Sequence, residues 1–265
     1  MRTKSLLALI AIVFLISSCK DDDDNNSTLT PQNRSASCLV TKIEYEDIEA
    51  QEVAAVDIAY DENNRIVSVD SSMGGSYVIS YNENGVKGVY TNRLGIEIYT
   101  KSYVYNSSGK VSMVFVLDNI AGEQVLKQQL NYVYDNNGQL KSVVDYDVND
   151  GVKTQTGIAN FEFAVDNNNP SLIQYDQSGV LENLQFSYDD IGLNPFYGMF
   201  YGLNDFSTFH KSAIQRIVIS GTNNYTYEYK YGNFSKSVPN NLTVYKVDGD
   251  DVTKAFAYKF TLKCP

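Results

Sequence analysis

The sequence predicts an all-β protein: an antiparallel up-and-down meander of β-hairpins, strongly curved or nearly closed into a barrel, with one short aromatic helical or loop insertion. Three observations predict this fold. A short phrase of apolar residues, Tyr, Asp or Asn, and Gly recurs along most of the 265-residue chain. Proline is scarce, with 5 residues, so regular strands are rarely interrupted. Cys38 and Cys264 stand at the two ends of the part that we expect to fold.

Residues 1–18 have the form of a lipoprotein signal peptide. Arg2 and Lys4 give a positive start, an apolar segment too short to span a bilayer follows, and small residues then lead to Cys19. This ending resembles the lipobox of bacterial lipoproteins, in which the cysteine becomes the lipidated first residue of the mature chain. The resemblance implies acyl chains, palmitate among them, on Cys19, and hence attachment to a membrane.

Residues 19–37 are predicted to be the lipidated cysteine followed by an acidic and polar tether. The four consecutive aspartates at 21–24 cannot pack into a core, and residues 25–37 are rich in Asn, Ser, Thr and Gln. The Lys-plus-acidic start resembles the export signal of surface lipoproteins in Bacteroidota. We therefore expect an outer-membrane protein, with the surface-exposed face favoured over the periplasmic face.

Residues 38–265 are predicted to form a single all-β domain made of repeated hairpins. The clearest copy of the repeat, at 132–140, reads Tyr-Val-Tyr-Asp-Asn-Asn-Gly-Gln-Leu, and others begin at Ile58, Ile79, Tyr103, Ile173 and Phe186. Residues two apart lie on one face of a strand, and Asp or Asn opens a type I turn. Gly, or an Asn that tolerates the left-handed conformation, then leads into the returning strand. Isolated hairpins are unstable, so successive hairpins must pair into one sheet.

This phrase is similar to the YD repeats of RHS-type proteins, most closely at 132–140. The chain as a whole resembles Bacteroidota surface or periplasmic lipoproteins of unknown function that are built from such Tyr-Asp hairpins. The resemblance implies a curved antiparallel meander that approaches a barrel, and it implies no activity. The copies are irregularly spaced and too few for the hollow shells of RHS proteins, which argues against a toxin-encapsulating role.

Closure of the sheet is predicted from its two terminal cysteines. Export permits disulfides, so we expect Cys38 and Cys264 to pair and to bring the first and last strands together; two unpaired buried thiols are the alternative. Closure also removes long edges that invite aggregation, although a twisted open sheet curled over its own core could serve instead. A membrane-spanning barrel is disfavoured, because Lys141, Asp145 and Asp147 place charge on a strand face.

An aromatic segment at 192–212 interrupts the repeat, and we take it as the candidate ligand site. Asn194 and Pro195 are typical of a helix cap and first turn, and the aromatic residues that follow recur at helical spacing. The functional interpretation is an aromatic platform for a ligand such as a glycan. The alternative is a plug that caps one end of the sheet. The candidate binding residues are Tyr197, Tyr201, Phe206 and His210.

Charge argues against nucleic acid as a partner. The chain has 21 basic and 32 acidic residues, and loss of Arg2 and Lys4 with the signal peptide leaves 19 against 32, a net charge of −13. Such a chain repels phosphate backbones. The acid-rich stretch at 44–52 is expected to be a solvated loop or a short exposed helix.

No catalytic, metal or cofactor motif stands out. The single histidine, His210, has no nucleophile elbow near it, and the cysteines are too far apart for zinc-finger spacing. The Asp-rich run at 145–151 lacks the acidic ligand that closes an EF-hand loop and is better explained as a turn. The sequence therefore predicts a non-catalytic cell-envelope lipoprotein that binds a glycan, peptide or protein partner. The alternative is a structural lipoprotein without a small-molecule ligand.

Overall fold

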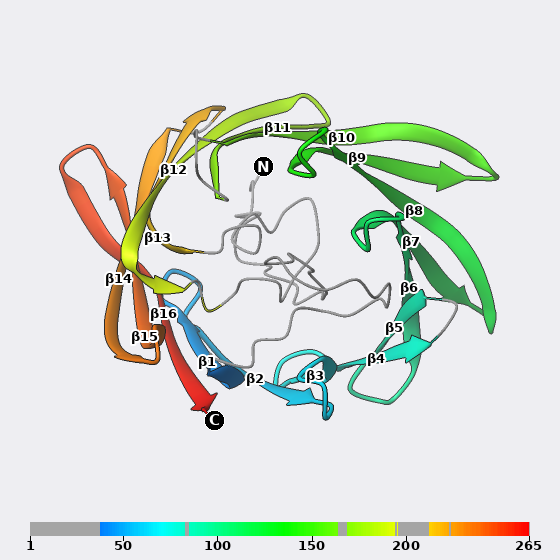
Figure 1. The fold of residues 1–265 in the computed structure, drawn as a ribbon, viewed down its shortest axis with the longest axis horizontal. Coiled ribbons are helices and arrows are strands. Elements are labelled where there is room, and N and C mark those ends of the chain that lie inside the picture. The colour runs from blue at the N-terminus through cyan, green and yellow to red at the C-terminus, as the bar shows by residue number, and fades with distance from the viewer. Residues whose placement is uncertain are drawn as a thin grey trace.

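The computed structural model describes residues 38–82, 85–163, 169–193, 195, 212–222 and 224–264. In this part of the chain, sixteen antiparallel strands follow one another in sequence order and close into a barrel. The ring closes because β1 (Leu39–Asp47) pairs with β16 (Asp251–Lys263) (Figure 1). The predicted all-β meander is confirmed, and of the two alternatives for its sheet the closed one is found.

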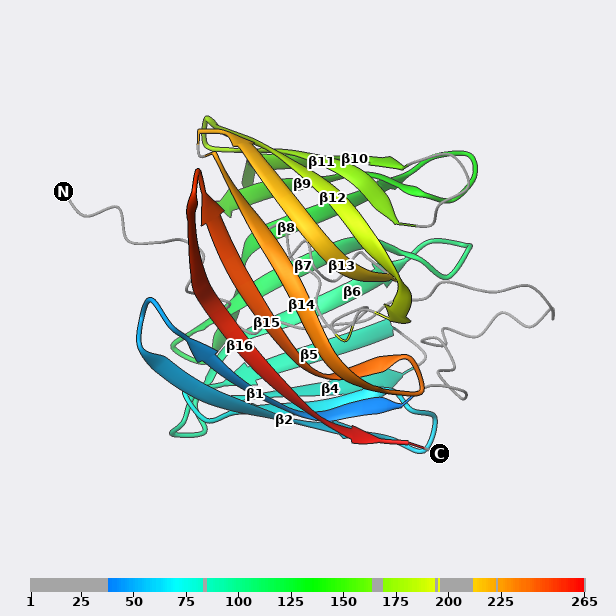
Figure 2. The same cartoon turned by 90° about the vertical axis from the view of Figure 1, so that its left-hand side faces the viewer.

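The other strands alternate in direction and lie tilted across the barrel wall (Figure 2). Their bounds are β2 (Glu52–Tyr60), β3 (Ile66–Ser71), β4 (Ser76–Asn82), β5 (Gly85–Thr91), β6 (Glu97–Tyr105), β7 (Val111–Ile120), β8 (Glu123–Tyr134), β9 (Leu140–Asn149), β10 (Val152–Phe163), β11 (Pro170–Gln177), β12 (Val180–Leu193), β13 (Ser212–Gly221), β14 (Tyr225–Ser235) and β15 (Val238–Asp248).

The hydrophobic core lies inside the barrel. One cluster of buried side chains includes residues from every one of the sixteen strands. In a closed sheet only the inner face can bring such residues together, because the outer faces point away from one another. Strand β2 shows the resulting alternation: Val56 and Ile58 are buried, whereas Asp57 and Ala59 are exposed. The core face of each strand is therefore its inward face.

A turn joins each strand to the next at one or the other end of the barrel (Figure 2). We call the end that holds Cys38, Cys264 and the turns after even-numbered strands the terminal end, and the other the distal end. Four turns consist of two residues, both with positive φ: Ala121–Gly122, Asp150–Gly151 and Ser178–Gly179 at the distal end, and Lys236–Ser237 at the terminal end. Such turns match the twist of the strands that they join. The predicted hairpin copy that begins at Ile173 therefore uses this shorter turn.

Four turns have the geometry expected of the Tyr-Asx-Gly phrase. In each, a side-chain oxygen of Asp or Asn accepts backbone N–H bonds of 2.8–3.0 Å from the residues two and four positions later; these residues are Asp61, Asn92, Asn106 and Asp135. The residue three positions later is left-handed in every case: Asn64, Gly95, Gly109 and Gly138. The Asn92 turn follows Thr91 rather than a tyrosine, so the phrase does not mark it.

Four of the repeat tyrosines, and Tyr231 outside the repeat, have a second role. In five even-numbered strands, an inward tyrosine donates its hydroxyl hydrogen to a backbone carbonyl near the start of the preceding strand. These tyrosine–carbonyl pairs are Tyr60–Val40, Tyr81–Ile66, Tyr134–Val111, Tyr188–Pro170 and Tyr231–Ile214. All five bonds lie towards the terminal end, where they hold neighbouring strands together on the core side.

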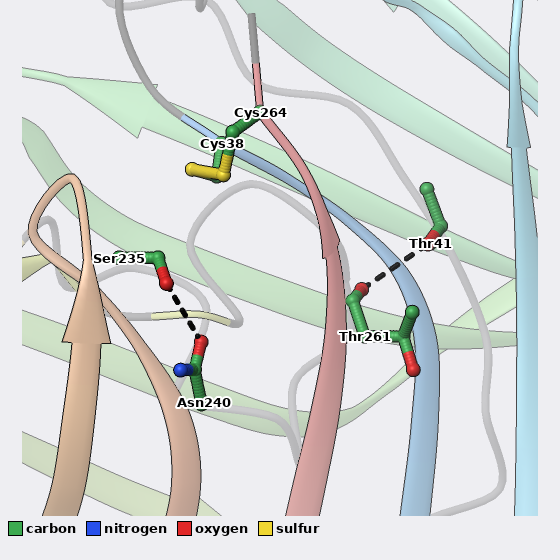
Figure 3. The surroundings of a disulfide bond; sticks show 6 residues. All are labelled: Cys38, Thr41, Ser235, Asn240, Thr261 and Cys264. Atoms are coloured by element: carbon green, nitrogen blue, oxygen red, sulfur yellow. Dashed lines mark hydrogen bonds between the residues drawn. A yellow bond between two sulfur atoms is a disulfide. The ribbon is translucent and has the colours of Figure 1, made fainter.

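A disulfide joins Cys38 and Cys264, as predicted, at the seam between β1 and β16 (Figure 3). The two Cα atoms are 4.2 Å apart, although the residues are separated by 226 positions in sequence. In the same seam, the Thr41 hydroxyl donates to the Thr261 carbonyl at 3.2 Å. The barrel is therefore a covalently closed ring at its terminal end.

Two expectations about charged segments are wrong. Residues 44–47 belong to β1 and Glu52 begins β2, so the expected acidic loop or helix is reduced to the turn at 48–51. Asp145 does not lie on an outward face: it is only 3% exposed and shares the inward face with Val143. The charge of Asp145 therefore does not argue against lipid contact.

The predicted aromatic insertion at 192–212 falls almost entirely outside the described residues, as do the signal peptide and tether at 1–37. These predictions remain predictions. Within the described residues, no helix is long and apolar enough to cross a membrane.

Candidate functional site

The ligand-binding residues predicted from sequence lie outside the described residues. This holds for Tyr197, Tyr201, Phe206 and His210, and also for the predicted lipidation site, Cys19. The structure therefore leaves the aromatic platform and the plug open as alternatives. Of the cysteines, Cys38 and Cys264 are brought together as the disulfide described above.

A polar cluster inside the barrel is the strongest candidate site in the described part of the chain. It consists of Lys101 on β6, Gln128 on β8 and Asp145 on β9. Lys101 and Gln128 share one row of the sheet, because each pairs with Val116 from opposite sides. The Gln128 amide donates to both carboxylate oxygens of Asp145, at 2.9 and 2.8 Å. A neutral side chain thus holds the carboxylate in a fixed orientation.

Lys101 is a buried cation. The residue is 8% exposed, and among the described residues no carboxylate oxygen lies within 4.0 Å of its ammonium. Burial lowers the pKa of Lys101 from its ordinary 10.5 to about 8, and the charge of Asp145 only partly opposes this shift. A buried ammonium that lacks a close counter-charge is costly to the fold, so its presence calls for a reason.

Asp145 has the opposite shift. Burial raises the pKa of its carboxyl above the ordinary value, and the nearby charge of Asp147 acts in the same direction. The hydrogen bonds from Gln128 and the charge of Lys101 lower the Asp145 pKa but do not cancel the effect of burial. The cluster therefore contains one cation and one carboxylate whose charged forms are both disfavoured by burial.

Tyrosine side chains surround this cluster on the inward face. Tyr132 and Tyr175 are buried, and the charge of Asp145 acts on the pKa of both. On β6, Tyr99 stacks on Tyr90 with ring centroids 5.0 Å apart, and its buried hydroxyl has no hydrogen-bond partner among the described residues. Tyr103, two residues past Lys101, is also buried. The cluster thus places two ionisable side chains among buried tyrosines.

The chemistry of the cluster suits recognition of a neutral polar group. A hydroxyl can accept a hydrogen bond from an ammonium and donate one to a carboxylate, so Lys101 and Asp145 offer complementary partners to the same kind of group. Within the described residues, no group of three or more His, Cys, Asp or Glu side chains could hold a metal ion. The prediction that the protein needs no cofactor stays a prediction.

Lys101, Gln128 and Asp145 were not predicted as site residues. The available signal was Lys101 itself. It lies two residues from Tyr99 and Tyr103 and four from Tyr105, so all four side chains share one face of the strand. A lysine in the inward register of an aromatic strand indicates a buried charge. Asp145 gave no comparable signal, because simple alternation along its strand from Leu140 places it on the outward face.

The fold defines a class of protein: closed, sixteen-stranded, antiparallel barrels with a hydrophobic interior. Two solved structures are similar in fold. A porin-like protein from Bacteroides uniformis has a TM-score of 0.59 at 13% identity, covering 84% of this chain and 98% of that chain. A porin-like protein from Bacteroides vulgatus has a TM-score of 0.56 at 12% identity, covering 85% and 98%. At these identities the likeness concerns the fold alone. The sequence matches no family model and no curated protein.

Proposed function

We propose that this chain is a non-catalytic, lipid-anchored protein of the cell envelope, whose barrel stands in water and binds a hydroxyl-rich ligand, a glycan in the first place. The observation that carries the ligand class is the pairing, in one buried cluster, of the Gln128-anchored carboxylate of Asp145 with the ammonium of Lys101, on which the charge of Asp145 acts. Sugar hydroxyls can bridge such groups, and tyrosine rings supply apolar surface for the sugar faces. A peptide with hydroxyl side chains is the runner-up ligand.

The outward faces of the strands support a barrel that stands in water. Charged and amide side chains occupy exposed positions within strands on widely separated parts of the wall: Asp57, Asn160, Gln174, Gln185, Arg216, Lys230, Asn241 and Lys259. Arg or Lys facing lipid at the bilayer midplane costs about 2–4 kcal/mol each. The porin-like neighbours suggest an envelope location for this chain as well, but its outer wall favours an anchored barrel over an embedded one.

The ligand proposal is tested with the full-length protein in mild detergent, on an array of envelope glycans followed by calorimetry with the glycan that binds. We expect Lys101→Met and Asp145→Asn each to weaken binding by about tenfold or more, which corresponds to ~1.4 kcal/mol. Lys87→Met, on β5 and facing outward, is the matched control and should bind like the wild type. Unchanged binding by both interior variants would overturn the proposal.

The anchor is tested separately, because it rests on residues 1–37. Cells fed a clickable palmitate analogue should label the wild type and not Cys19→Ser, and the variant should leave the membrane fraction. Protease added to intact cells should remove the protein if it faces outward. Protection from protease would place the barrel on the periplasmic side instead.

A second function is favoured by a specific observation: the repeat tyrosines belong to the core and tie strands together through their hydroxyls. This is what a structural envelope lipoprotein without a small-molecule ligand requires. The two functions differ in what the interior charges do. In a structural protein, Lys101→Met changes stability alone; in a binding protein, it changes affinity for the glycan as well.

A further inference from the structure

Exposed apolar side chains gather at one end of the barrel. The structure describes thirteen large apolar residues that are exposed, and ten lie in a distal turn or within two residues of one. We call these the distal rim: Val53, Met73, Leu94, Ile96, Ile98, Ile120, Val152, Val180, Leu181 and Val252. The remaining three are Val78, Val133 and Phe234, on the wall and towards the terminal end.

The distal rim runs round the mouth of the barrel rather than along one side. Its members flank seven of the eight distal turns, from the turn between β1 and β2 to the turn between β15 and β16. Leu94 and Val53 are 82% and 71% exposed, respectively. Exposed apolar residues are normal when scattered singly, but their concentration at one mouth of the barrel marks an interaction surface.

The same end is strongly acidic. Ten exposed carboxylates lie in the distal turns or within two residues of them: Glu46, Glu49, Glu52, Asp70, Glu123, Asp150, Asp176, Asp248, Asp250 and Asp251. Only Arg93 and Lys153 supply positive charge in the same positions, and Arg93 donates to the carbonyls of Ser72 and Gly74. The distal end therefore combines exposed apolar side chains with an excess of negative charge.

Charge selects among the occupants that could cover the distal rim. A second copy docked rim to rim would face ten like charges on each side, and like-charge contacts cost several kcal/mol. An anionic bilayer surface is repelled for the same reason. A protein surface that presents apolar side chains flanked by Lys and Arg gains from both features, because its charge complements the rim.

We infer that the distal rim docks a protein partner whose contact surface is apolar and basic. Ten apolar and ten acidic residues together approach the ~20–30 residues that each side of a standard interface contributes. The rim lies at the opposite end of the barrel from Cys38, where the predicted tether joins, so an anchored barrel can present it away from its attachment point. This inference goes beyond the proposed glycan site and does not depend on it.

The test uses the full-length protein and two fluorescent peptides of equal length, one alternating Leu and Lys, the other Leu and Glu. The rim variant carries Val53→Thr, Leu94→Asn, Val152→Thr and Val252→Thr; the matched control carries Val78→Thr and Val133→Thr. We expect the Leu-Lys peptide to bind the wild type and the control, and to bind the rim variant at least about tenfold more weakly. The Leu-Glu peptide should not bind.

A charge variant with Asp248→Asn, Asp250→Asn and Asp251→Asn should weaken Leu-Lys binding and flatten its dependence on salt, whereas Asp57→Asn on the wall should not. Thermal melting of every variant establishes that the barrel is intact. Absence of Leu-Lys binding, or equal binding to the rim variant, overturns the inference. Two other outcomes also overturn the inference. The first is self-association of the wild type that the rim substitutions abolish. The second is binding of the wild type to vesicles containing phosphatidylglycerol that the rim substitutions abolish.

Discussion

At the scale of single residues, the packing of two tyrosines depends on one glycine. Tyr77 on β4 is fully buried, and its hydroxyl lies 3.3 Å from that of Tyr103 on β6. Gly88, on the intervening strand β5, leaves the space that the Tyr77 ring crosses, because a Cβ there would overlap the Tyr77 hydroxyl and ring. The missing side chain at Gly88 therefore lets two tyrosines from strands that are not neighbours meet.

Gly88→Ala is therefore expected to destabilise the barrel. Tyr77 cannot move into solvent, so the added methyl group overpacks the core, which costs typically about 1–3 kcal/mol. The free energy of unfolding is measured with urea. Lys87→Ala, on the same strand and facing outward, is the control and should change it by less than about 0.5 kcal/mol. Equal stability of Gly88→Ala and wild type would contradict the packing described.

Lys101 predicts a dependence of stability on pH. Its pKa is about 8 in the folded chain and 10.5 ordinarily, so between these values the unfolded chain holds the proton more often and stability rises with pH. At pH 7 the buried charge costs roughly 3 kcal/mol at most, from a shift of this size. Lys101→Met should raise the free energy of unfolding at pH 7, and its advantage should shrink as pH rises from 8 to 10.5.

The measurement is urea unfolding of wild type and Lys101→Met in steps of pH. Lys87→Met is the control, and its difference from wild type should stay flat over the same range. A Lys101→Met difference that is also flat would mean that Lys101 titrates normally. A folded Lys101→Met variant also makes loss of glycan binding interpretable, since unfolding then cannot explain the loss.

At the scale of elements, the repeat hairpins that begin at Ile58 and Tyr132 are each held by an Asx turn and a tyrosine hydroxyl. In the clearest copy, Asp135 organises the turn, while Tyr134 donates to the Val111 carbonyl at 2.8 Å. The turn fixes the register of β8 and β9, and the hydroxyl bond fixes β8 against β7. One short phrase thus specifies three consecutive strands.

Tyr134→Phe should destabilise the protein by about 1 kcal/mol, because it leaves the Val111 carbonyl without this donor but keeps the ring. Thermal and urea unfolding both report the loss. Tyr146→Phe, on the outward face of β9, is the matched control and should have little effect. If both variants lose the same stability, the hydroxyl bond has no special part in the repeat.

Much of the strand arrangement could be predicted from the repeat, but the inward register could not. The phrase at 132–140 correctly predicts the turn at Asp135 and the strands on either side. A bulge between Leu140 and Ser142 then adds one residue to β9, which reverses the faces of all later residues. Simple alternation from Leu140 puts Asp145 outside, whereas the bulge turns it inward. Asp145 was missed as a site residue for this reason.

At the scale of the whole molecule, the disulfide joins the first and last strands, whose pairing the hairpin repeat does not specify. Hairpins say how consecutive strands pair, whereas the pairing of β1 with β16 is specified by residues 226 positions apart. The position of Cys38 and Cys264 at the two ends of the domain predicted this closure correctly. The number of strands in the ring could not be predicted, because copies such as Asn92 lack the tyrosine.

Removing the bond with Cys38→Ser and Cys264→Ser should lower the free energy of unfolding by up to about 5 kcal/mol, from the chain entropy of so long a loop. The circular dichroism of the folded variant should remain that of a β-protein, since all sixteen strand pairs persist. Dithiothreitol added to the wild type is the parallel measurement. A variant as stable as wild type would mean that the seam is held by its backbone pairing alone.

The barrel is closed with its apolar face inside, and we propose that its outer wall faces water. Spin labels placed at Asn160→Cys and Arg216→Cys, both outward on the wall, test it in native envelope membranes. A water-soluble relaxation agent should reach both labels freely, and oxygen dissolved in lipid should have little effect on them. Labels shielded from the water-soluble agent and relaxed by oxygen would contradict the account, because the wall would then lie in the bilayer.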